Sequence, residues 1–145
     1  LGQKDVGHEV LIVGGGMVGC ETADLLGEQG HAVSIVEMAP EIGRDVQDAV
    51  RYFLLRRLAE HKTLVYTNTV VKEFLEDSVR VEKDGREMSL TGFDTMIVAV
   101  GARPVRRLME ELNGKVKELH GIGDAVEARK AIDAIEEGAG LALKL

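Results

Sequence analysis

Near its N-terminal end the chain reads Glu9-Val10-Leu11-Ile12-Val13-Gly14-Gly15-Gly16-Met17-Val18-Gly19. The apolar run 9–13 stops at three glycines, which is typical of a parallel strand buried on both faces. Residues 17–29 carry alanine and leucine at helical spacing, and Gly30 supplies a left-handed helix stop. A second apolar run, 32–36, ends at Glu37. Strand, helix and strand within about thirty residues predict a βαβ unit with a right-handed crossover.

The middle of the chain predicts a helix followed by short strands. Residues 45–61 are amphipathic, and the expected core positions of this helix are Val46, Val50, Phe53, Leu54 and Leu58. Apolar or alternating stretches then predict short strands at 64–66, 70–71, 79–82 and 88–90. Because Asp84-Gly85 suits a tight hairpin turn, we expect a three-stranded antiparallel meander here.

The last third of the chain is expected to close the sheet and then to leave it. Residues 95–100 predict a buried strand that ends at Gly101, and the segment beyond Pro104 predicts a short helix at 107–112, a weak strand at 115–119 and a helix from about Ala128. The expected fold is therefore a Rossmann-like, doubly wound α/β domain, with helices on both faces of a parallel sheet and an inserted β-meander.

Composition restricts the kind of protein to which such a fold belongs. The chain has 145 residues, 45% of them hydrophobic and 30% charged, which predicts one compact, soluble domain without a membrane span. A formal charge of −7 disfavours nucleic acid and anionic membranes as partners. The single cysteine, Cys20, excludes an intrachain disulfide or a cysteine pair, which fits a cytoplasmic location. Because the chain begins at Leu1, we interpret it as a piece of a longer protein.

The glycine-rich stretch 14–19 fits the pattern G-x-G-x-x-G between a strand and a helix. Gly14 permits the tight turn, Gly16 lets the backbone approach a pyrophosphate, and Gly19 lets the helix lie close to the sheet. Helix N–H groups and the positive end of the helix dipole then hold the phosphates. A glycine-rich turn without a ligand is the alternative to this interpretation.

Glu37 stands where an acidic side chain accepts hydrogen bonds from the ribose hydroxyls of a dinucleotide. Its carboxylate disfavours the 2′-phosphate of NADPH, and the following Met38 supplies no cation; Arg44 is the nearest one. The pattern therefore predicts NADH as the bound cofactor. A solvated glutamate at the end of a strand is the alternative.

Three stretches together resemble a known family: 14–37, Val98-Ala99-Val100-Gly101-Ala102-Arg103-Pro104, and Gly121-Ile122-Gly123-Asp124-Ala125. They look like the NADH domain of the two-dinucleotide-domain flavoproteins, the pyridine nucleotide-disulfide oxidoreductase superfamily. The stretch 123–130 is similar to the C-terminal part of NADH:flavin oxidoreductases of the 2,4-dienoyl-CoA reductase and trimethylamine dehydrogenase type.

This resemblance implies an oxidoreductase in which FMN and an iron–sulfur cluster perform the substrate chemistry and separate domains bind FAD and NADH. It implies that residues 1–105 form the NAD(H)-binding domain, which passes hydride to a flavin, and that 106–145 return to the FAD domain, where Asp124 meets the FAD ribityl chain. The isolated chain is then expected to be inactive without the flavin domains. It is also expected to self-associate through 106–145, because an apolar helix face there lacks its partner.

Several assignments remain open at this level. The stretch 14–37 also fits an FAD site, although the short segment between Pro104 and Gly123 leaves no room for the inserted domain expected after an FAD fingerprint. Glu21 is either a neighbour of the nicotinamide, as the resemblance implies, or a first-turn glutamate that suits the helix dipole. Cys20 is either a redox thiol or a small residue packed under the glycine turn.

Alternatives also remain for the basic residues and for the function itself. Arg103, Arg106 and Arg107 either reach a cofactor phosphate or a partner domain, or form a solvated face. A non-catalytic NADH-binding regulatory module is the alternative function. We expect neither a catalytic acid or base nor a metal ligand in the chain. The candidate cofactor-binding residues are Gly14, Gly15, Gly16, Met17, Val18, Gly19, Glu21, Glu37, Met38, Val100, Gly101 and Asp124.

Overall fold

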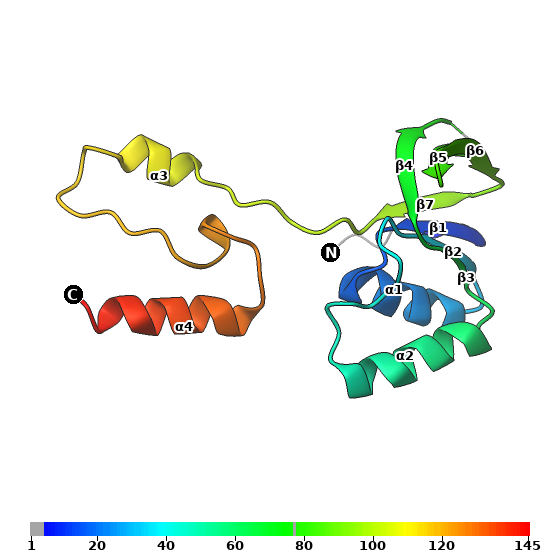
Figure 1. Ribbon diagram of the computed structural model, residues 1–145, viewed down its shortest axis with the longest axis horizontal. Coiled ribbons are helices and arrows are strands. Elements are labelled where there is room, and N and C mark those ends of the chain that lie inside the picture. The colour runs from blue at the N-terminus through cyan, green and yellow to red at the C-terminus, as the bar shows by residue number, and fades with distance from the viewer. Residues whose placement is uncertain (1–4, 77) are drawn as a thin grey trace. The chain divides into compact units, whose positions relative to one another are not determined.

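The computed structural model describes residues 5–76 and 78–145, and the chain divides into two compact units, Leu1–Gly101 and Ala102–Leu145 (Figure 1). The first unit contains two helices and seven strands among its described residues. In chain order they are β1 (Glu9–Val13), α1 (Met17–Glu28), β2 (Ala32–Val36), α2 (Asp48–Glu60), β3 (Leu64–Tyr66), β4 (Thr69–Phe74), β5 (Ser78–Lys83), β6 (Arg86–Thr91) and β7 (Thr95–Val98).

The main sheet has four parallel strands in the order β3-β2-β1-β7. From β1 the chain passes through α1 to β2 and through α2 to β3, and it later returns to pair β7 with the other side of β1. The strand order therefore reverses at β1. In open parallel sheets, ligands bind at the carboxyl ends of the strands beside such a reversal.

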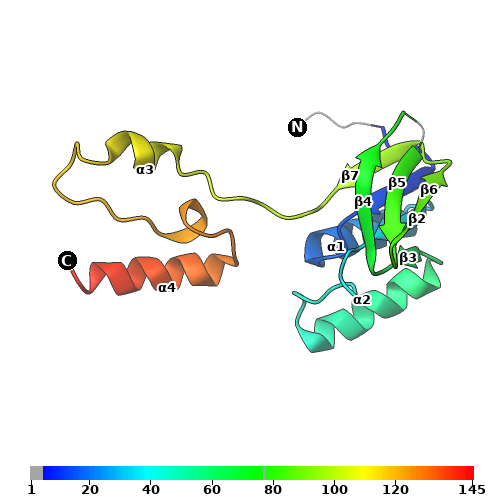
Figure 2. The ribbon, with the colours of Figure 1, turned by 45° about the horizontal axis from the view of Figure 1, so that its top comes forward.

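The two faces of this sheet bury different partners. Because side chains alternate along a strand, Val10 and Ile12 face one side of β1 while Leu11 and Val13 face the other. The first pair belongs to a core with the buried residues of α1 and α2. The second pair packs with the meander, mainly against Val79, Val81 and Leu90. Figures 1 and 2 both show α1 and α2 on one side of the sheet and β4–β6 on the other.

The predicted Rossmann-like α/β class and its meander are confirmed. In this unit, however, helices cover one face and the meander covers the second face, where helices were also expected. Strands β4, β5 and β6 pair antiparallel, and Asp84 and Gly85 both have positive φ, 52° and 73°, at the hairpin between β5 and β6. Two consecutive positive φ values suit the right-handed twist of a two-residue hairpin.

Helix α2 differs from its prediction at its start and on one face. It begins at Asp48 instead of residue 45, and Leu54 and Leu58 are buried as expected. Val50 and Phe53 were also predicted to lie in the core, and this was wrong, because they are 51% and 50% exposed. A helix laid on a sheet buries a stripe about 100° wide, and these two side chains fall outside it.

The second unit contains α3 (Arg107–Leu112), a 3₁₀ turn η1 (Gly123–Ala125) and α4 (Ala131–Ala142). Helix α3 has the predicted bounds, whereas α4 begins three residues after the expected position. The weak strand expected at 115–119 does not form. A strand needs a neighbour for its backbone hydrogen bonds, and the part of the chain from 102 onward contains none.

Candidate functional site

The glycine turn lies at the carboxyl end of β1, where the strand order reverses. The N–H of Gly14 donates to the carbonyl of Val36 at 2.8 Å, and the N–H of Ala99 donates to the carbonyl of Val13 at 2.7 Å. Gly14 has a φ of 105°, and a Cβ at this position would overlap the carbonyl oxygen of Ala99. The ends of β1, β2 and β7 are therefore joined at one edge of the sheet, with the turn between them.

Gly19 performs the packing role that its spacing predicts. It lies in the first turns of α1 and is buried, and a Cβ there would overlap the carbonyl oxygen of Gly14. Because the obstacle is backbone, a side chain at residue 19 would push the helix away from the turn. The start of α1 is thus held directly against the end of β1.

The peptide of Gly15 is fixed from three sides. Its N–H donates to Oε2 of Glu37 at 2.6 Å. Its carbonyl accepts from the N–H of Gly43 at 2.6 Å and from the thiol of Cys20 at 3.3 Å. A turn held this firmly presents its remaining N–H groups in one orientation.

Glu37 places its carboxylate beside the glycine turn instead of extending into solvent. Besides the Gly15 bond, its Oε1 accepts the N–H of Ala39 at 2.7 Å, and the side chain is half-buried. An ionised carboxylate has about four acceptor positions, so two remain for other donors. Met38, which follows it, is 72% exposed. The geometry therefore favours a specific role for Glu37 over that of a solvated strand-end residue.

Asp45 is the site residue that the sequence did not reveal. It lies in the loop between β2 and α2, and its Oδ1 accepts the N–H of Met17, the first residue of α1, at 2.8 Å. A Cβ added to Gly16 would lie 3.4 Å from Oδ2 of the same carboxylate. Within the described residues, the N–H groups of Gly16 and Val18 meet no protein acceptor. The amides at this helix end therefore favour an anion, and Asp45 supplies one.

Cys20 is a packing residue, which confirms the simpler of its two interpretations. Its side chain is fully buried, and burial, reinforced by the negative charge of Asp45, raises the pKa of the thiol to about 11. A thiol with such a pKa stays protonated at neutral pH and is a poor nucleophile. Its hydrogen bond to the Gly15 carbonyl supports the turn instead.

The remaining candidates lie farther from this centre. Val18 and Glu21 are exposed on the first turns of α1, and Glu21 has no recorded partner among the described residues. Val100 and Gly101 are exposed in the segment after β7, where Gly101 has a φ of 87°. Asp124 is exposed in η1, within the second unit. The structure thus brings together the glycine turn, Glu37 and the end of β7.

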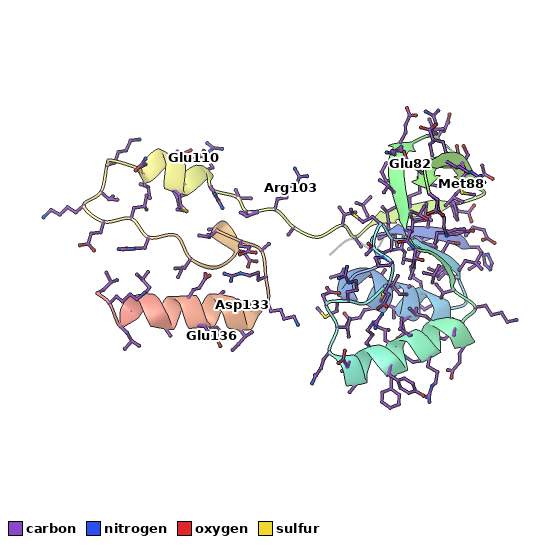
Figure 3. All side chains as sticks on the ribbon, in the orientation of Figure 1. Glu82, Met88, Arg103, Glu110, Asp133 and Glu136 are labelled. Atoms are coloured by element: carbon purple, nitrogen blue, oxygen red, sulfur yellow. The ribbon has the colours of Figure 1, made fainter. Side chains whose placement is uncertain are left out.

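Two of the three arginines considered above serve their own unit. The Nη2 of Arg106 donates to the carbonyl of Val126 at 2.7 Å, and the Nε of Arg107 lies 2.7 Å from Oε1 of Glu111 on the same helix. Arg103 is exposed on the segment that follows Gly101 (Figure 3).

The described part of the structure contains neither a metal-binding cluster nor a membrane-spanning helix. Among the residues that it describes, no three His, Cys, Asp or Glu side chains gather in a way that would bind a metal ion. In the same ranges no helix has both the length and the apolar composition needed to cross a bilayer.

The parallel sheet, its order reversal and the glycine turn define the chain as a Rossmann-like α/β domain. Its sequence matches the family described as pyridine nucleotide-disulphide oxidoreductase over residues 1–132. The chain belongs to this family, whose members are flavin-dependent pyridine nucleotide oxidoreductases.

Curated relatives are considerably longer than this chain. A metal reductase of Desulforamulus reducens is 34% identical over 99% of this chain and 26% of its own length. An NADH oxidase of Thermoanaerobacter brockii is 35% identical over 92% of this chain and 21% of its own length. The chain thus spans about a quarter or less of these relatives.

Solved structures show the same arrangement. A 2-naphthoyl-CoA reductase in complex with 2-naphthoyl-CoA matches 98% of this chain and 22% of its own, with a TM-score of 0.81 and 26% identity. A histamine dehydrogenase from Rhizobium sp. 4-9 matches 97% of this chain and 24% of its own with a TM-score of 0.82, and at 16% identity this likeness concerns the fold.

Proposed function

We propose that the first unit binds NADH and holds its nicotinamide for hydride transfer to a flavin carried by other domains of a longer enzyme. The observation that carries the proposal is the placement of Glu37. Its carboxylate is bonded to the N–H of Gly15, so the acidic group and the helix end lie side by side at the strand reversal. One ligand with a diphosphate and an adjoining ribose fits both groups.

The diphosphate is assigned to the start of α1. The N–H groups of Gly16, Met17 and Val18 belong to the N-cap and the first two residues of α1, and the twelve-residue helix directs its positive dipole end at the same place. This local field allows a chain with a net charge of −7 to bind a dianion. Gly16 has no side chain of its own that would block a diphosphate from the start of α1. The carboxylate of Asp45 is the side chain that lies beside it.

The adenosine ribose is assigned to Glu37. With Oε1 and Oε2 already fixed by two backbone N–H groups, the carboxylate presents its remaining acceptor positions in a set direction. Both ribose hydroxyls of NADH are donors that match these positions. A 2′-phosphate would instead be placed against a carboxylate, which costs several kcal/mol when no cation intervenes.

The chemistry of this unit is then positioning. Bound NADH supplies the hydride and a flavin accepts it, so the protein must hold the nicotinamide in a productive orientation. Val100 and Gly101, which follow β7, are assigned to the nicotinamide side of the site. Glu21 on α1 is assigned to the same side. With no acid or base required here, the redox activity depends on the flavin domains.

The second unit is assigned to the FAD domain of the parent enzyme, which in this proposal also carries FMN and an iron–sulfur cluster. Leu108, Ile132 and Ile135 are 65%, 55% and 64% exposed, and no residue of α3 or α4 is buried. Side chains of this type require a cover in the complete protein. Asp124 is assigned to the FAD ribityl chain, and in the isolated chain the uncovered face favours self-association.

Calorimetric titration of the 145-residue chain with NADH, NADPH and FAD tests the proposal. We expect NADH to bind more than about tenfold more tightly than NADPH, a difference of about 1.4 kcal/mol or more, and FAD not to saturate the site. Glu37→Gln should weaken the binding of NADH and reduce the difference in affinity between NADH and NADPH. Glu28→Gln, an equal change of charge at the far end of α1, should do neither.

Three results would contradict the proposal. Failure of well-folded protein to bind any nicotinamide dinucleotide would remove the assigned function. Preferential binding of FAD would make the turn a flavin site. Oxidation of NADH by the flavin-free chain would overturn the division of roles between the domains.

A further inference from the structure

The carboxylate of Asp45 lies where the proposed function places a phosphate. Its Oδ1 accepts the N–H of Met17 at 2.8 Å, and its Oδ2 lies 3.4 Å from the position that a Cβ on Gly16 would take. Gly16 is the residue whose missing side chain opens the turn to a diphosphate. An aspartate from a loop 28 residues away therefore occupies the anion position of α1.

The loop that carries Asp45 is anchored by buried residues, whereas the Asp45 side chain is held by one exposed hydrogen bond. Ile42 and Val46 are buried, and the N–H of Gly43 donates to the carbonyl of Gly15 at 2.6 Å. The Nε of Arg51 also donates to the carbonyl of Ile42 at 3.0 Å. Asp45 itself is exposed, so its carboxylate leaves the helix end by rotation of the side chain while the loop stays in place.

Nearby charges do not allow the carboxylate and a diphosphate to occupy this place together. Glu37 adds a second negative charge beside the turn. The guanidinium of Arg51 is engaged by Glu41 at 2.8 Å, and Arg44 is exposed on the same loop. The helix end has few N–H groups to share, and two anions on it would repel each other.

We propose that Asp45 is an internal competitor of the cofactor: its carboxylate caps α1 and must be displaced by the diphosphate of the dinucleotide. The inference rests on the proposed function. The capped state satisfies the helix end when no ligand is present, as an N-cap residue does. Because the same carboxylate returns as the ligand leaves, Asp45 weakens cofactor binding and favours release of the oxidised product.

The test compares Asp45→Asn with Asp48→Asn in the 145-residue chain. Asparagine at residue 45 keeps the shape and an acceptor oxygen but loses the charge, so the NADH dissociation constant should fall by about three- to tenfold, the range expected when a charge-assisted hydrogen bond is replaced by a neutral one. Asp48→Asn makes the same substitution three residues along the chain, at the exposed first residue of α2. It should change the dissociation constant by less than about twofold, because exposed charges are screened.

Adenosine separates an effect on the phosphates from a general change in the site. It carries the ribose but no phosphate, so wild type and Asp45→Asn should bind it equally, as followed by backbone amide shifts in NMR. The amide resonance of Met17 should also shift when NADH is added to the wild type, because its acceptor changes from a carboxylate to a phosphate.

The outcomes separate this inference from the proposed function. If the wild type binds NADH and Asp45→Asn binds it no more tightly, Asp45 is not a competitor and the inference alone is overturned. An equal gain in adenosine affinity would overturn it as well. If neither protein binds NADH, the proposed function fails and the inference fails with it.

Discussion

The two compact units are stabilised in different ways. In the first unit, strands and helices bury two apolar clusters on opposite faces of a parallel sheet. In the second unit, Gly123 is the one described residue that is buried, and its helices leave large apolar side chains exposed. Polar contacts connect its parts instead, including the hydrogen bonds that Glu137 accepts from the N–H of Gly123 and from Arg129.

This difference indicates which part of the chain has a core sufficient to fold by itself. A unit with its own core gains most of its stability from burial. A unit held by exposed ion pairs and hydrogen bonds gains little, because water competes for each contact. The first unit is therefore expected to stay folded alone, and the second to depend on a cover from outside the chain.

Truncation of one apolar side chain in each unit gives the largest expected contrast. Leu54 on α2 is 2% exposed, so Leu54→Ala should lower the free energy of unfolding by about 4 kcal/mol through lost burial and the cavity left behind. Ile135 on α4 is 64% exposed, and Ile135→Ala should cost less than about 0.5 kcal/mol. Urea unfolding is the measurement.

Tyrosine fluorescence follows the Leu54 change in the first unit, and amide exchange in α4 follows the Ile135 change in the second unit. The chain has no tryptophan and two tyrosines, Tyr52 and Tyr66, and both belong to the first unit. Val50→Ala, at an exposed position of α2, is the matched control for a change on the same helix. Similar losses from Leu54→Ala and Ile135→Ala would show that the units do not differ as described.

Glycine-to-alanine changes sharpen the contrast at the backbone. Gly19 in α1 has no room for a Cβ because the Gly14 carbonyl blocks it, so Gly19→Ala should cost about 3 kcal/mol in the tyrosine-detected transition. In α4, a Cβ on Gly140 would meet nothing within 4 Å. Gly140→Ala should therefore stabilise that helix by up to about 1 kcal/mol, seen as slower amide exchange in α4. Equal effects of the two changes would contradict the packing described for Gly19.

Most of the first unit could be predicted because its signals are local. The apolar runs that end at Gly14 and Glu37 mark β1 and β2 within a residue, since strands buried on both faces need uninterrupted apolar sequence. The exposure of Phe53 could not be predicted, because spacing of three and four residues also describes positions at the edge of the buried stripe. The missing strand at 115–119 has another cause: a strand depends on a neighbour, which the sequence of the segment does not specify.

The candidate site divides in the same way. The glycines and Glu37 were identified from their spacing, because backbone geometry requires those residue types at those positions. Asp45 could not be identified, since an aspartate that caps a helix from a distant loop lacks the adjacent position by which caps are recognised. The one hint is Gly43, whose positive φ of 66° turns the loop toward α1.

The smallest expected effect is a pH dependence confined to the second unit. Glu137 accepts the N–H of Gly123 at 2.6 Å and pairs with Arg129, and these contacts hold its pKa below the ordinary glutamate value. A carboxyl group whose pKa is lowered in the folded state stabilises that state fully at pH values above the pKa of the unfolded chain, about 4.3. This stabilisation is lost as the pH falls through the lower pKa of the folded state. Exchange of the Gly123 amide should therefore accelerate in acid relative to the intrinsic rate.

A neutral variant isolates this titration. Glu137→Gln keeps an acceptor for the Gly123 amide but removes the charge, so the relative protection of that amide should be lower at neutral pH and should no longer fall on acidification. Glu136→Gln, on the exposed side of the same helix (Figure 3), should behave as the wild type. Cys20 in the first unit provides the internal reference, because burial raises the pKa of its thiol and the thiol stays neutral throughout acidification. A matching acid-dependent loss of protection at its amide that Glu137→Gln abolishes would show that the two units unfold together, because an independent first unit has no reason to follow Glu137.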